Sequence, residues 1–119
     1  MCKDLRTELT LFTGTAVWYK HPLFRAYHYT DGVQYLANEA GAYWLIDLIV
    51  GCQLEHATVK AEPFQVWDLV VNEDRSAWLI MTDGNSRTVH KETLDVTDFP
   101  LSEIRLYLTG NVLLLPSEY

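Results

Sequence analysis

The side chains that most often carry proton transfer, nucleophilic attack or metal binding are few in this sequence. The four histidines are His21, His28, His56 and His90, and the two cysteines are Cys2 and Cys52. No two histidines have the i, i+2 or i, i+4 spacing with which one strand or one helix holds a metal ion, and there is no Cys-x-x-Cys motif. We therefore predict no metal site and no cofactor.

Cys52 and His56 are four residues apart and could form a thiolate–imidazole pair if both lie on one helix. Cys52 continues an apolar stripe, however, and His56 lies past the expected end of that helix. We favour an inert thiol in the core.

Asp47 interrupts the apolar run at residues 42–50. A carboxyl group buried in such a run could act as a general acid or base, with His21 or His28 as its partner. In the alternative that we favour, Asp47 lies on the one exposed strip of a helix or in a structural pair.

Aromatic side chains are dense in the first 44 residues of the chain. The candidates for a ligand-binding or partner-binding patch are Trp18, Tyr27, Tyr29, Tyr43 and Trp44. Such rings can line a groove or an interface, but they are also common in a small core, which is the simpler interpretation.

The elements that would position these residues are organised around the stretch 30–52. Small or apolar residues recur there at helical spacing, and Asp31 or Thr30 can cap the first turn. Gly41 is unfavourable in a helix interior, so we predict that the helix bends or breaks there.

After Gly41 the stretch is apolar nearly all round, which is more than one sheet face can cover. The residues expected to be almost fully buried against a sheet are Leu45, Leu48 and Ile49. Tyr43, Ile46 and Val50 lie off that face, and the apolar run 112–115 also requires cover on both sides. We therefore predict self-association, most simply as a two-fold homodimer.

The rest of the chain predicts one short helix and several strands. The helix is expected at residues 3–12, and strands at 15–20, 25–29, 64–72, 77–82, 86–94, 104–109 and 112–115. Residues 53–63 are expected to be irregular, and a helix at 101–108 is an alternative to the strand at 104–109. Helices early and strands late, without βαβ alternation, indicate a single α+β domain over residues 1–119. Its antiparallel sheet would carry the central helix, or a bent helix pair, packed on one face.

The charge balance is acidic, with nine basic and 16 acidic residues and a net charge of −7. A nucleic-acid-binding protein uses Lys and Arg to neutralise phosphates, so we predict no nucleic-acid partner. The apolar run after Gly41 is too short for a bilayer span, and residues 1–11 lack the apolar region of a signal peptide. We predict no membrane partner, and a cytoplasmic location with free thiols is the simplest interpretation.

Three short motifs are distinctive. They are Phe12-Thr13-Gly14-Thr15 followed by Tyr19, then Thr30-Asp31-Gly32-Val33, then Gly41-Ala42-Tyr43-Trp44-Leu45. Together they resemble a family of small uncharacterised bacterial and phage proteins that carries only a domain-of-unknown-function label. The resemblance implies a cytoplasmic, single-domain accessory protein, for example of a mobile element, and it implies no activity or site residue.

These observations favour a non-enzymatic binding or protein–protein interaction module that presents an acidic surface and an aromatic patch to a protein partner. The alternative is a small enzyme whose pocket lies at the helix–sheet junction, with Asp47 and His28 or His21 as acid–base groups.

Overall fold

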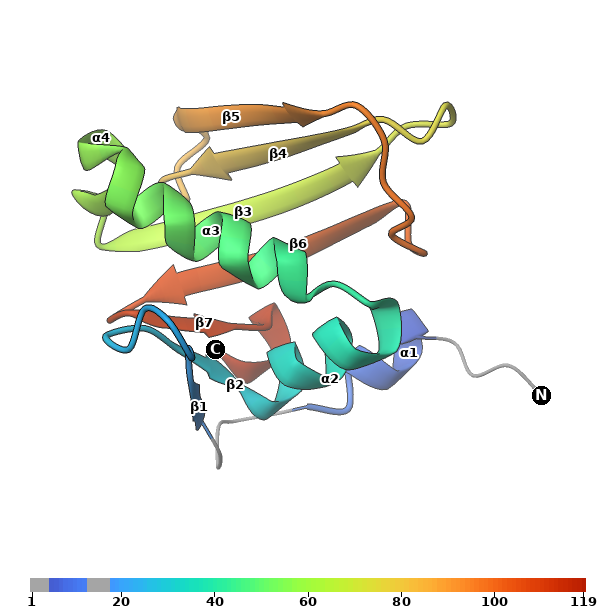
Figure 1. The fold of residues 1–119 in the computed structure, drawn as a ribbon, viewed down its shortest axis with the longest axis horizontal. Coiled ribbons are helices and arrows are strands. Elements are labelled where there is room, and N and C mark those ends of the chain that lie inside the picture. The colour runs from blue at the N-terminus through green and yellow to red at the C-terminus, as the bar shows by residue number, and fades with distance from the viewer. Residues whose placement is uncertain (1–4, 13–17) are drawn as a thin grey trace.

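The computed structural model describes residues 5–12 and 18–119, and within them it has the α+β architecture that the sequence predicts (Figure 1). The strands of its seven-stranded sheet are β1 (Trp18–Lys20), β2 (His28–Thr30), β3 (Phe64–Val71), β4 (Ala77–Thr82), β5 (Thr88–Leu94), β6 (Glu103–Thr109) and β7 (Val112–Leu114). The helices are α1 (Leu5–Leu9), α2 (Asp31–Ala40), α3 (Tyr43–Glu55), α4 (Ala57–Lys60) and the 3-10 helix η1 (Pro116–Glu118). In this part of the chain no helix is long and apolar enough to cross a membrane.

The sheet is mixed, with strand order β1-β2-β7-β6-β3-β4-β5. Neighbouring strands are antiparallel except β2 and β7, which run parallel, with His28 opposite Val112 and Tyr29 opposite Leu113. The prediction of a purely antiparallel sheet is therefore wrong at this pair. β2 pairs with β7, a strand far along the sequence. The path of the chain between them sets the parallel direction of this pair, and no local side-chain pattern encodes it.

The predicted strands agree with the structure best where they form local hairpins. β3, β4, β5 and β6 lie where they were expected, and the alternative helix at 101–108 is wrong. The strand predicted at 25–29 begins only at His28, because residues before it form a tight loop in which Tyr27 N–H donates to the carbonyl of Phe24. Parts of the segments predicted at 3–12 and 15–20 lie outside the described residues.

The long helical stretch is broken at Gly41, in agreement with the prediction. α2 begins after Thr30, whose side chain accepts a hydrogen bond from the N–H of Val33. It ends at Gly41, which has a left-handed conformation with φ of 63° that glycine adopts at little cost. α3 then continues to Glu55 and α4 follows, so the prediction of an irregular segment at 53–63 is wrong over most of its length.

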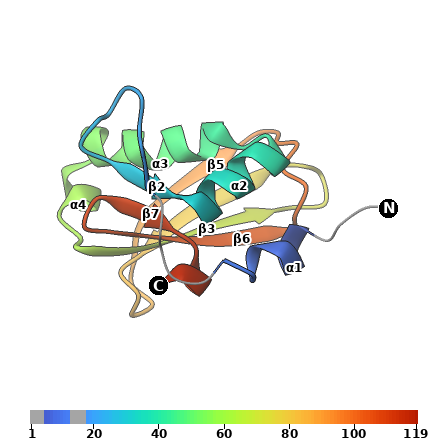
Figure 2. The same ribbon diagram turned by 90° about the horizontal axis from the view of Figure 1, so that it is seen from below.

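Figure 2 shows α2 and α3 on one side of the sheet and α1 on the other. One core cluster includes Leu45 and Ile49 of α3 together with Trp67 and Met81 of the sheet. Leu48 is only half-buried, so the predicted burial is right for Leu45 and Ile49 and wrong for Leu48.

A buried amide pair fixes the end of α3 to the sheet. The side chains of Gln53 and Gln65 donate to each other, each at 2.8 Å. Gln65 also donates to the carbonyl of Val59 at 2.8 Å and accepts from Nε1 of Trp67 at 2.9 Å. Because buried polar groups require partners, these bonds hold α3, α4 and β3 in one relative position.

A buried carboxyl group, Glu118 of η1, caps the first turn of α2. Its Oε1 accepts from the hydroxyl of Thr30 at 2.5 Å and from the N–H of Leu115 at 3.0 Å, and its Oε2 accepts from the N–H of Gly32 at 3.3 Å. Burial raises the pKa of Glu118 above its ordinary value of 4.5.

This raised pKa has a consequence for stability. The folded protein holds the Glu118 proton more tightly than the unfolded chain does, so this group lowers stability as the pH rises from 4.5 through its folded pKa. The side chain introduced by Glu118→Gln cannot ionise. We therefore expect the free energy of unfolding of this variant in urea to rise relative to that of the wild type as the pH increases across that window. Glu73→Gln, at an exposed turn, is the control, and a wild-type-to-variant difference that does not change with pH would contradict the prediction.

Candidate functional site

A group of tyrosines lies where the β1–β2 hairpin meets the first half of α3. Tyr19 and Tyr29 are directly opposite each other across the two strands, and their rings stack with centroids 5.7 Å apart. Both side chains are half-buried. Cross-strand aromatic pairs of this kind stabilise a hairpin and present ring surface to one face of it.

α3 adds a third tyrosine and a carboxylate to this group. Tyr43 and Asp47 are four residues apart on α3 and therefore lie on the same side of the helix. Burial raises the pKa of Tyr29, and the nearby Tyr43, Tyr19 and Asp47 raise it further, which places each of these three groups within electrostatic reach of Tyr29. Tyr43 is 43% exposed, and the Asp47 side chain is 65% exposed. We call Tyr19, Tyr29, Tyr43 and Asp47 the tyrosine patch.

Asp47 is also paired with His21, one of its two predicted partners. The His21 Nε2 lies 2.7 Å from Asp47 Oδ1, while the His21 Nδ1 accepts hydrogen bonds from the N–H groups of Leu23 and Phe24, each at 3.1 Å. The proton of the neutral ring is therefore on Nε2 and is donated to Asp47. His21 is 2% exposed, and the pair closes the loop at 22–26. With both ring nitrogens engaged, His21 positions the loop and Asp47 rather than exchanging protons with a substrate.

The other predicted site residues are dispersed. His28 lies on the opposite face of the hairpin from Tyr29, beside the exposed Trp18, with ring centroids 6.2 Å apart. Tyr27 is buried in the core, and Trp44 is half-buried beside Leu94. Tyr29 and Tyr43 are thus the two predicted aromatic residues that the structure brings together. The prediction omitted Tyr19, which the hairpin register identifies.

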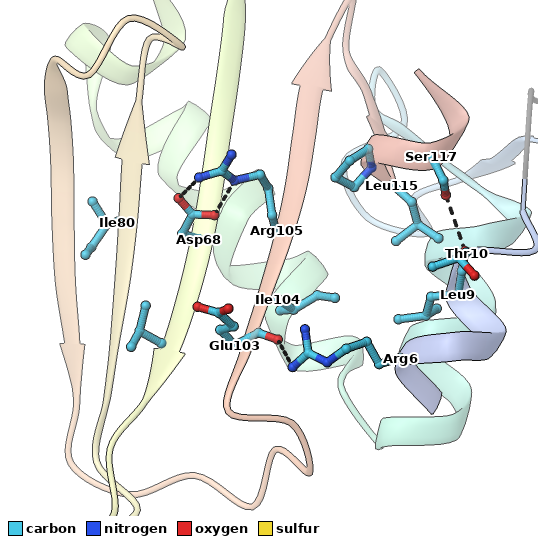
Figure 3. Close-up of a pocket in the computed structure, with 12 residues that line it drawn as sticks. Arg6, Leu9, Thr10, Asp68, Ile80, Glu103, Ile104, Arg105, Leu115 and Ser117 are labelled. Atoms are coloured by element: carbon cyan, nitrogen blue, oxygen red, sulfur yellow. Dashed lines mark hydrogen bonds and ion pairs between the residues drawn. The ribbon is translucent and has the colours of Figure 1, made fainter. Parts of the chain in front are cut away.

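A cavity lies on the other side of the sheet, between α1, η1 and strands β3 and β6 (Figure 3). Its volume is about 470 Å³. Two arginines that line it have partners, since Arg105 donates to both oxygens of Asp68 at 2.7 and 3.1 Å and Arg6 donates to the backbone carbonyl of Glu103 at 3.4 Å. Asp47 and His21 do not line this cavity, so it does not supply the acid–base pocket of the enzyme alternative.

Four side chains of metal-ligating type gather at the C-terminal end of α3, although the sequence predicts no metal site. They are Cys52, His56, His90 and Glu92. The metal prediction considered pairs of histidines and the Cys-x-x-Cys motif, and it considered Cys52 with His56 only as a thiolate–imidazole pair. The informative pairs are mixed, with Cys52 and His56 at i, i+4 on the helix and His90 and Glu92 at i, i+2 on β5. Burial, with Glu92 nearby, raises the pKa of Cys52 to about 12, so its thiol is protonated and not a nucleophile.

Comparisons with known proteins agree with the resemblance noted in the sequence. The model of a family of unknown function, DUF6876, matches residues 3–119. Neither the curated proteins nor the solved structures give a match. The match covers almost the whole chain, and the chain therefore belongs to the family of unknown function DUF6876.

Proposed function

We propose that this chain is a non-enzymatic protein-binding module whose tyrosine patch accepts a basic side chain of a partner protein. The observation that supports the proposal best is the stacked Tyr19–Tyr29 pair, with Tyr43 and an exposed carboxylate within electrostatic reach of Tyr29. A guanidinium or ammonium group is attracted to the faces of aromatic rings, and a neighbouring carboxylate adds a charge-assisted hydrogen bond. Arginine suits such a site better than lysine, because its planar group stacks and donates at the same time.

The charge of the whole chain supports the same kind of partner. A net charge of −7 attracts a basic surface over a longer range than the patch itself and raises the rate of encounter. One version of the proposal is an accessory protein that covers a basic, nucleic-acid-binding surface of a host protein.

The enzyme alternative receives less support from the geometry. The Asp47–His21 pair is committed to the loop at 22–26, and the cavity between α1 and the sheet is lined by other residues. A catalytic site requires polar groups that converge on a cavity, and these two features lie apart.

A second copy of the chain is the other partner that the sequence predicts. Ile46 and Val50, which motivated that prediction, are 3% and 2% exposed within one chain, and the run 112–115 is buried as well. Tyr43 is the residue of that argument that still presents apolar surface, and it belongs to the tyrosine patch. A homodimer therefore stays a prediction, and sedimentation equilibrium measures it directly.

The test of the proposed function is binding of an arginine-containing peptide, followed by ¹⁵N NMR. We expect the peptide to shift resonances of the hairpin and of the first half of α3, and the same peptide with neutral citrulline in place of arginine to bind much more weakly. Tyr43→Ala should weaken binding by about 2–5-fold, the usual worth of a cation–π contact at an exposed site. Higher salt should weaken binding further.

Matched variants make the result specific. Tyr43→Phe keeps the ring and should keep most of the affinity, and Trp78→Ala, at an exposed position on the face of the sheet away from α3, should leave it unchanged. Equal binding of the arginine and citrulline peptides, or equal loss in Tyr43→Ala and Trp78→Ala, would refute the proposal.

A further inference from the structure

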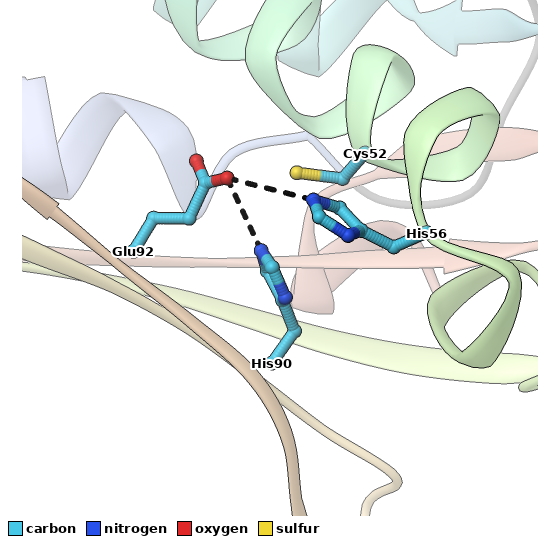
Figure 4. A group of neighbouring side chains, drawn as sticks. All are labelled: Cys52, His56, His90 and Glu92. Carbon is cyan, nitrogen blue, oxygen red and sulfur yellow. Dashed lines mark ion pairs between the residues drawn. The ribbon is translucent and has the colours of Figure 1, made fainter.

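The C-terminal end of α3 faces the edge strand β5, and four side chains converge between them (Figure 4). Cys52 and His56 come from α3 and its C-cap, and His90 and Glu92 come from β5. From this arrangement we propose that Cys52, His56, His90 and Glu92 bind one divalent transition-metal ion, with Zn²⁺ as the preferred ion. This site is separate from the tyrosine patch and does not depend on the proposed function.

The distances fit a metal site. One ligand atom from each of the four residues lies within 4.8 Å of all the others. Glu92 Oε1 is 3.2 Å from His90 Nε2 and 4.0 Å from His56 Nε2, and the two imidazole rings are 4.4 Å apart between centroids. In a tetrahedral zinc site, bonds of about 2.0–2.3 Å place the ligand atoms roughly 3.3–3.8 Å apart. A bound ion would draw the most distant ligand atoms together by roughly 1–1.5 Å.

A buried nitrogen without a well-formed hydrogen bond is a second indication of a ligand. His90 Nε2 is buried and makes no hydrogen bond of good geometry among the described residues, and Glu92 Oε1 lies 3.2 Å away at ion-pair distance (Figure 4). Leaving a buried polar atom unpaired costs free energy, and such atoms are rare in folded proteins. A metal ion bound to His90 Nε2 would remove this cost.

The composition of the group selects the kind of ion and its role. A thiolate, two imidazoles and a carboxylate are the donors that zinc uses in proteins, whereas calcium and magnesium use oxygen donors. The ion would bind Cys52 as the thiolate and release its proton to the solvent. Four protein ligands fill a tetrahedral shell and leave no position open for a substrate, so the ion would be structural. It would join the end of α3 to the edge strand β5.

The surrounding structure holds the ligands in place. The Gln53–Gln65 amide pair fixes the backbone next to Cys52, and the N–H of His56 donates to the Cys52 carbonyl at 3.0 Å. The Trp67 and His90 rings are in an edge arrangement, with centroids 6.4 Å apart. Supporting contacts of this kind orient the ligands of metal sites.

The test uses Co²⁺ as a spectroscopic substitute for Zn²⁺, with protein treated with a chelator and kept reduced. We expect one Co²⁺ per chain, a near-ultraviolet thiolate-to-cobalt charge-transfer band, strong visible bands typical of tetrahedral Co²⁺, and displacement of the Co²⁺ by Zn²⁺. Cys52→Ser should lose the charge-transfer band. His90→Gln should bind at least about 100-fold more weakly, since changes outside the ligand shell already cost about 10–100-fold.

His28→Gln is the matched histidine control, because His28 lies on the β1–β2 hairpin and should leave the spectrum and affinity unchanged. Circular dichroism checks that each variant is folded. Absence of stoichiometric Co²⁺ binding by folded wild-type protein, or a charge-transfer band that survives in Cys52→Ser, would overturn the proposal.

Discussion

Gln65→Leu is expected to lower the free energy of unfolding by about 3–5 kcal/mol. The substitution removes both hydrogen bonds with Gln53, the bond donated to the Val59 carbonyl and the bond accepted from Trp67. Leucine fills a similar volume but leaves the Trp67 N–H and the Gln53 Oε1 buried without partners, while the Gln53 Nε2 keeps its bond to the Ile49 carbonyl. Each such group costs about 1–3 kcal/mol.

A double-mutant cycle in urea tests this explanation. Gln53→Leu alone should also be strongly destabilising. The Gln53→Leu/Gln65→Leu double variant should lose less stability than the sum of the two single losses, because neither amide of the pair remains to be left without its partner. Gln34→Leu, a change of the same type on the half-exposed side of α2, is the control and should have a small effect. Additive losses would show that the two amides do not act as a pair.

Gly32→Ala is expected to destabilise the protein by about 1–3 kcal/mol, although alanine is normally the better helix former. A Cβ atom at Gly32 would lie 2.7 Å from the Glu118 carboxyl carbon and 2.8 Å from Leu115 Cδ1. The Glu118 carboxyl cannot move aside cheaply, because it is buried and accepts hydrogen bonds from Thr30, Gly32 and Leu115. Thermal or urea unfolding measures the loss.

Gly51→Ala is the matched control for this substitution. Gly51 also lies in a helix, but a Cβ atom there would have nothing within 4 Å. We expect this variant to gain up to about 1 kcal/mol, the difference in helix propensity. Addition of Glu118→Ala to Gly32→Ala should recover part of the loss that steric crowding causes, and no coupling between the two sites would contradict the explanation.

The sequence predicts best those elements whose causes are local. Gly41 ends α2 because a left-handed residue is needed there, and the hairpin β3–β4 follows from short turns between β-forming runs. The predicted burial of Leu48 was wrong because a helix that is apolar nearly all round has no single periodic face from which the buried side can be identified. Gln53 was assigned to an irregular segment, although it lies in α3. A buried glutamine at this position is explained by its hydrogen-bond partner Gln65, which is not a neighbour in the sequence.

The candidate sites depend on longer-range contacts and were predicted only in part. The residue types suggested His21 or His28 as a partner of Asp47, but they did not select His21 or indicate its second role as acceptor of two loop N–H groups. The alternation along β5 places His90 and Glu92 on one face, yet only the packing of α3 against the sheet brings Cys52 near them. No local spacing encodes that packing.

The parallel pairing of β2 with β7 also affects synthesis of the chain on the ribosome. Thr30 and Glu118 are 88 positions apart, so the hydrogen bonds that Glu118 adds at the start of α2 have to wait until Glu118 is made. At about 5–20 residues per second, this interval is roughly 4–18 s. During that time the β1–β2 hairpin lacks its neighbouring strand and exposes unpaired backbone groups of β2. The nascent chain is therefore most vulnerable to mispairing and to chaperone capture at its first-made strands, which complete their contacts last.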